Sequence, residues 1–144
     1  MEAGGARTPG RTPGASLQDV FLRAVAGVPD EDGRGETVAE ALGYLQQGFD
    51  AHYAKSDGAA DDDILVGDNA YAWAVETIAR LDEPEFVAVA GRMIRDGSGE
   101  ISAGNDVSLE LWVPHLADLL RVISGEDDGT SVRRVRQAAE EVAV

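Results

Sequence analysis

The sequence predicts an all-α fold of about six helices. Apolar residues recur at three- and four-residue spacing through most of the chain, while alternating runs of β-branched residues are nearly absent. Capping residues precede these periodic segments, and glycine or proline follows several of them. With 144 residues, the chain can bury a core in one domain. We expect that domain to span residues 16–144.

Residues 1–15 contain Arg-Thr-Pro-Gly twice, at 7–10 and 11–14, among glycine and alanine. This composition predicts a disordered tail, because it offers little apolar surface to bury. A first helix should begin at Ser16, whose hydroxyl is a good N-cap, and end before Gly27.

The second helix is predicted to begin at the capping box Thr37–Glu40 and to run to about Lys55. The acidic stretch 30–33 before it is predicted to be a solvated turn, since it lacks the alternating ligands of a calcium loop. Near the end of this helix, Asp50 and His52 diverge by about 200° and should not form a pair with each other.

A central helical hairpin is predicted from residues 61–81 and 82–101, joined at Asp82-Glu83-Pro84. Asp68 falls on the apolar face of its first helix beside Gly67, so we expect a buried hydrogen-bonding anchor there. Our interpretation of three acidic residues at the start of this helix is N-terminal capping, with a weak Mg²⁺ site as the alternative. These residues are Asp61, Asp62 and Asp63.

Two further helices are predicted after residue 108. Pro114 should begin or kink the first of them, and Thr130 should cap the last. His115 is interpreted as a surface or interface side chain. The last helix carries the only basic cluster, which we expect to pair with Glu140 and the acidic body; the alternative is that it holds a diphosphate or a partner's carboxylates. The cluster consists of Arg133, Arg134 and Arg136.

The composition disfavours several classes of function. The formal charge of −15 disfavours nucleic-acid binding, and no apolar run reaches bilayer length, so a cytoplasmic location is the default. Arginine outnumbers lysine eleven to one, as a high-GC genome or a salty cytoplasm would produce. There is no cysteine, phosphate-binding glycine loop, nucleophile elbow or zinc-binding helix motif. We therefore expect no cofactor and no autonomous enzymatic activity.

Residues 64–74 read Ile-Leu-Val-Gly-Asp-Asn-Ala-Tyr-Ala-Trp-Ala, and the next predicted helix ends in Gly99-Glu100. Over about residues 40–105 this pattern resembles the trans-isoprenyl diphosphate synthases, whose matching segment reads apolar-Leu-x-Gly-Asp-Tyr-Leu-x-x-x-Ala. Catalytic members carry two Asp-Asp-x-x-Asp motifs for Mg²⁺ and the allylic diphosphate, and neither motif is present here. The chain is most similar to the small, non-catalytic component of two-component hexaprenyl and heptaprenyl synthases, which keeps Asp-x-His and Gly-Asp segments, here 50–52 and 67–68.

This resemblance implies a truncated isoprenoid-synthase-like bundle that binds a catalytic prenyl synthase and helps to set product length. The positions expected to serve structure or an interface are Gly67, Asp68, Tyr71, Gly99 and Glu100. The alternative is an unrelated helical interaction module or homodimer, in which Gly67 permits close helix approach. A third hypothesis is a minimal Mg²⁺-diphosphate enzyme using Asp61–Asp63 and the arginine cluster.

Overall fold

The computed structural model describes residues 16–56, 61–105 and 107–143. The side chains of residues 53–56 and 61–64 are outside this description, as is the tail predicted at 1–15. The described segments contain six helices and no strand, which confirms the all-α prediction. The helices are α1 (Leu17–Val25), α2 (Arg34–Ser56), α3 (Asp61–Ala79), α4 (Pro84–Ser102), α5 (Leu109–Ser124) and α6 (Asp128–Ala143).

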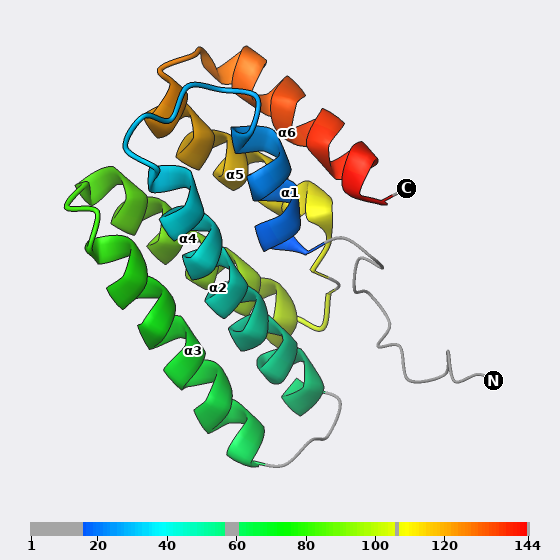
Figure 1. The fold of residues 1–144 in the computed structure, drawn as a ribbon. Helices are drawn as coiled ribbons and strands as arrows, with labels where there is room; N and C mark the ends of the chain where they lie inside the picture. The colour runs from blue at the N-terminus through cyan, green and yellow to red at the C-terminus, as the bar shows by residue number, and fades with distance from the viewer. Residues whose placement is uncertain (1–15, 57–60, 106, 144) are drawn as a thin grey trace.

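Helix α2 is the centre of the bundle (Figure 1), packing against α1, α3, α4 and α5. Helices α1, α5 and α6 gather around one end of α2. Helix α3 lies along the edge, where its main neighbour is α2 and its second neighbour is α4. The predicted hairpin of α3 and α4 therefore forms, but its first helix is peripheral and has one side free of other described helices.

Helix starts follow side-chain capping, although not always at the predicted residue. The Ser16 hydroxyl accepts a hydrogen bond from the Asp19 amide at 3.0 Å, as predicted. Helix α2 begins three residues before Thr37, because the Asp30 carboxylate accepts from the amides of Arg34 and Gly35. Asp30 is thus a cap rather than part of a freely solvated turn, since it satisfies amides that the first turn leaves unpaired.

Two other predicted starts also move. Asp127, rather than Thr130, caps α6, accepting from the Thr130 amide at 2.7 Å. Pro114 lies inside α5 instead of beginning it, and its missing N–H deprives one carbonyl of the preceding turn of its usual donor. Between α3 and α4, Asp82 adopts the left-handed conformation with φ of 54°, which short polar residues tolerate.

The core lies between α2 and the remaining helices and is almost entirely apolar. The largest fully buried side chains are Phe21, Phe86, Leu42, Leu45, Ile78, Met93, Leu116, Leu119, Leu120, Val20, Val38 and Val89.

No described helix is long and apolar enough to cross a bilayer.

A candidate interaction surface on the third helix

Helix α3 approaches α2 closely because glycines meet at their contact. A Cβ atom added to Gly67 would lie 3.2 Å from the Gly48 carbonyl oxygen and 2.7 Å from the His52 ring. One added to Gly48 would collide with the ring of Tyr71. The prediction that Gly67 permits close helix approach is therefore correct, but the approach is between α3 and α2 of the same chain.

Aromatic rings fill the space that these glycines leave. The His52 ring stacks on Tyr71 with centroids 5.1 Å apart, and Tyr71 meets Phe49 edge-on at 5.5 Å. Phe49 in turn stacks on Trp112 of α5 at 4.7 Å. We call these four residues the aromatic row. Gly97 of α4 completes the fit, since a Cβ there would lie 2.8 Å from Trp112. The row fixes the orientation of α3 against α2.

A histidine–carboxylate pair adds to the α2–α3 contact. His52 Nε2 lies 3.1 Å from Asp68 Oδ1, while the Asp68 side chain is 61% exposed. The expectation of a buried anchor at Asp68 is wrong, because Gly67 occupies the point of closest approach and turns the next residue about 100° toward solvent. Sequence reasoning also missed this partner for His52, which is 16 residues away along the chain.

Tyr71 is the most perturbed group at this contact. Burial of its hydroxyl raises the pKa of Tyr71 to about 12, which Ser98 opposes and Asp68 reinforces. The buried hydroxyl oxygen of Tyr71 has no hydrogen-bond partner among the described residues. The neutral phenol is therefore strongly favoured in the folded protein.

The second histidine makes a similar pair between α4 and α5. His115 Nε2 lies 2.9 Å from Asp96 Oδ2, and the His115 side chain is only 12% exposed. His115 is therefore mostly buried, contrary to the surface interpretation. Burial alone would raise the pKa of Asp96, but hydrogen bonds from His115 and Arg95 outweigh it and lower that pKa. This pair links α5 to α4, with the Asp96 side chain still 33% exposed.

The outer face of α3 is apolar and exposed. Leu65, Val66 and Trp73 are 62%, 56% and 52% exposed. Among the described residues, only one other large apolar side chain is exposed, Leu22 of α1, and it is less open at 37%. At 100° per residue, the three α3 side chains fall within an arc of about 100°. We call Leu65, Val66 and Trp73 the outer apolar face.

The outer apolar face has a defined shape and an acidic border. The Trp73 ring contacts the Tyr44 ring of α2 edge-on, with centroids 5.8 Å apart. This contact orients the indole, which remains exposed to solvent on the side away from α2. Exposed Asn69 and Glu76 lie within the same arc, and exposed Asp68 lies about 60° outside it. A ligand for this face would therefore need an apolar surface with basic groups around it.

The other predicted site residues do not join this face. Gly99 and Glu100 lie near the end of α4, and a Cβ at Gly99 would meet nothing within 4 Å. Asp61–Asp63 form the first turn of α3, but their side chains are outside the described residues. Among the side chains that are described, no three or more histidine, aspartate or glutamate residues come together as a metal site would require.

The three arginines of the cluster have three separate partners, of which two are acidic. Arg134 makes two hydrogen bonds to Glu126, at 2.7 and 2.9 Å, and Arg136 pairs with Glu110 at 2.7 Å. Arg133 instead donates to the Thr130 hydroxyl. The prediction of pairing with the acidic body is confirmed for two of the three, with Glu126 and Glu110 in place of the predicted Glu140.

Comparisons with known protein families, curated proteins and solved structures give no match.

Proposed function

We propose that this protein is a non-catalytic helical subunit that binds a partner protein through the outer apolar face of α3. The observation that carries the proposal is the concentration of exposed apolar side chains on one helix. The exposed side chains are those of Leu65, Val66 and Trp73. A contiguous apolar surface of this kind on a helical bundle indicates a site of interaction with another molecule. Aromatic anchors such as Trp73 contribute strongly to the affinity of protein interfaces.

The partner we propose is a catalytic prenyl synthase, whose product length this subunit would help to set. The support is the resemblance of residues 64–74, because that segment coincides with the outer apolar face. The absence of both Asp-Asp-x-x-Asp motifs from the sequence supports a role without catalysis.

The charge of the protein favours a different chain as partner over a second copy of itself. Two copies meeting at α3 would bring Glu76 and Asp68 of each toward a molecule of the same sign, and each copy carries a formal charge of −15. Like charges brought together across an interface oppose association. A basic border around an apolar groove on the partner would complement the same surface.

Co-expression tests the proposal. The tagged protein is produced with each intact, two-motif prenyl synthase encoded in the same genome, and the complex is purified and assayed for prenyl chain length. We expect one synthase to co-purify and its product length to change. Failure of every synthase to co-purify, with unchanged products, refutes the proposed partner. A stable homodimer in light scattering, with no other partner, would instead support self-association.

A further inference from the structure

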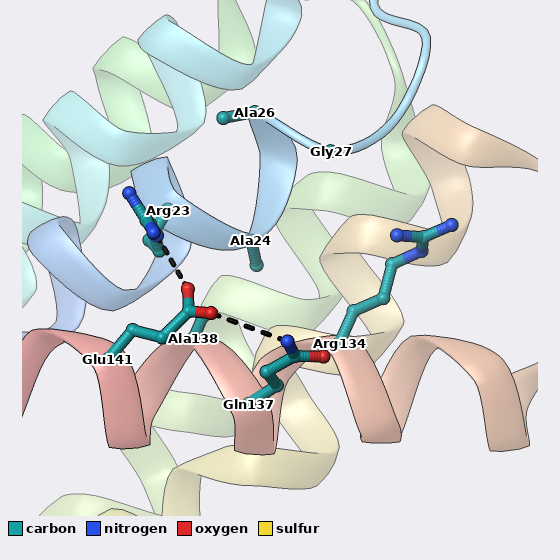
Figure 2. A pocket seen from close by; sticks show the side chains of 8 residues that line it. All are labelled: Arg23, Ala24, Ala26, Gly27, Arg134, Gln137, Ala138 and Glu141. Atoms are coloured by element: carbon teal, nitrogen blue, oxygen red, sulfur yellow. Dashed lines mark hydrogen bonds and ion pairs between the residues drawn. The ribbon is translucent and has the colours of Figure 1, made fainter.

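A cleft lies between the end of α1 and α6 (Figure 2), and its residues are far along the chain from those of the outer apolar face. It holds about 300 Å³, at the lower end of volumes typical of small-molecule sites. The α6 wall comes from positions three and four residues apart, which share one side of the helix. The lining residues are Arg23, Ala24, Ala26, Gly27, Arg134, Gln137, Ala138 and Glu141.

Two arginines stand at opposite ends of the cleft (Figure 2). Each is paired with a carboxylate of this chain. The Arg23 Nε donates to Glu141 Oε1 at 2.6 Å. Arg134 uses Nε and Nη2 for its two bonds to Glu126. Such pairing fixes the planes of the guanidinium groups without consuming all their donors.

The guanidinium N–H groups of these two arginines that the carboxylates do not use remain available at the cleft. Neither Nη of Arg23, nor Nη1 of Arg134, has a partner among the described residues. The missing side chain of Gly27 keeps Arg134 Nη1 accessible, because a Cβ there would lie 3.3 Å from it. Between the arginines, Ala24 and Ala138 supply a small apolar surface.

The remaining polar groups restrict the charge of a ligand. Glu141 also accepts from the Gln137 amide at 3.3 Å, and the hydrogen bond from Arg23 lowers the pKa of Glu141. Glu141 is therefore an anion at neutral pH. Glu126, which pairs with Arg134, is a second carboxylate, so the two guanidinium groups and the two carboxylates together carry no net charge. These two carboxylates oppose a dianion more strongly than a monoanion.

We propose that the α1–α6 cleft binds a small organic monocarboxylate. Its carboxylate accepts from Arg134 Nη1 at the Gly27 end, and its apolar stem lies over Ala24 and Ala138 toward Arg23. This site is separate from the outer apolar face, so it stands or falls independently of the proposed partner.

Titration of the full-length ¹⁵N-labelled protein with butyrate, followed by amide chemical shifts, tests this site. We expect saturable shifts at Ala24, Gly27 and Ala138. The Arg134→Gln variant should weaken binding by about tenfold or more, as loss of a charge-assisted hydrogen bond implies. The matched control is Arg136→Gln, which removes the same charge from α6 outside the cleft and should bind butyrate like the wild type.

A second variant leaves the charge unchanged. Gly27→Val places a side chain over Arg134 Nη1 and should also abolish saturable butyrate binding while the rest of the spectrum stays that of a folded protein. Shifts that grow linearly with butyrate as they do with sodium chloride, or equal affinity in Arg134→Gln and Arg136→Gln, overturn the site. Tighter binding of inorganic phosphate than of butyrate overturns the assignment of a monocarboxylate.

Discussion

Replacing Gly48 by alanine tests the packing that orients α3. The added methyl group would overlap the Tyr71 ring, which is confined by His52 on one face and by Phe49 at its edge. Overpacking a confined site costs about 1–3 kcal/mol, from which the better helix propensity of alanine subtracts about 0.5–1 kcal/mol. We expect a net loss of about 1–2 kcal/mol in the free energy of unfolding, or a melting temperature lower by about 3–8 °C.

The matched control is Gly91→Ala on α4. Gly91 is exposed within a helix, and a Cβ there meets nothing within 4 Å. Alanine should therefore stabilise the protein by about 0.5–1 kcal/mol. Urea unfolding followed by far-ultraviolet circular dichroism measures both variants. The loss at Gly48 should shrink when Tyr71 is also changed to alanine, since the clashing ring is then absent. A Gly48→Ala protein as stable as Gly91→Ala would refute the close contact between α2 and α3.

Three further predictions concern the charged and titrating groups. The folded-state pKa of Tyr71, near 12 against an ordinary 10.0, makes a stabilising contribution that is complete below about pH 10 and lost as pH rises toward 12. Solvent screening of this half-buried ring limits it to about 1–2 kcal/mol, and urea midpoints at about pH 9 and about pH 11.5 should show a smaller alkaline loss for Tyr71→Phe than for the wild type. The lowered pKa of Asp96 contributes stability above the ordinary aspartate pKa that is lost as pH falls through the folded value, so Asp96→Asn should flatten the acid limb of the stability profile; an unchanged limb would exclude the pairing with His115. Asp68→Asn should change the free energy of unfolding by less than about 1 kcal/mol because the side chain is mostly exposed, and a larger loss in urea unfolding would restore the buried-anchor interpretation.

The helices could be predicted because their apolar residues keep helical spacing. Leu17, Phe21 and Ala24 of α1, for example, are all buried as the pattern requires. The first residue of each helix was less predictable, because several neighbouring side chains can accept from the free amides of the first turn. Which side chain does so depends on the path of the chain before the helix. Asp30 precedes Thr37 in the sequence and reaches the first free amides, so α2 begins earlier than the capping-box pattern indicates.

The candidate site could be predicted only in part. Spacing places Gly67, Ala74 and Ile78 on the buried face of α3, as observed. It also makes α3 apolar on most sides, and periodicity alone cannot decide which apolar side a neighbouring helix covers. The exposure of Leu65 and Trp73 follows from the edge position of α3, which depends on tertiary packing.

Local spacing likewise carries no signal for contacts between distant elements. The pair formed by His52 and Asp68 joins two helices, and His115 with Asp96 joins two others. The α1–α6 cleft brings Arg23 together with Glu141, 118 residues later. No local pattern predicts these contacts, because each requires the complete bundle.

The most direct test of the central proposal is the affinity of surface variants for a co-purifying prenyl synthase. Leu65→Ser removes an apolar side chain from the outer apolar face, and Leu22→Ser makes the same change at an exposed position on α1. Calorimetric titration of each variant with the synthase measures its affinity. Comparing the two affinities separates an effect specific to the outer apolar face from the effect of losing any exposed apolar side chain. We expect Leu65→Ser to weaken binding by about tenfold or more and Leu22→Ser to leave it within about twofold. Equal affinities for the two folded variants would contradict the assignment of α3 as the interaction surface.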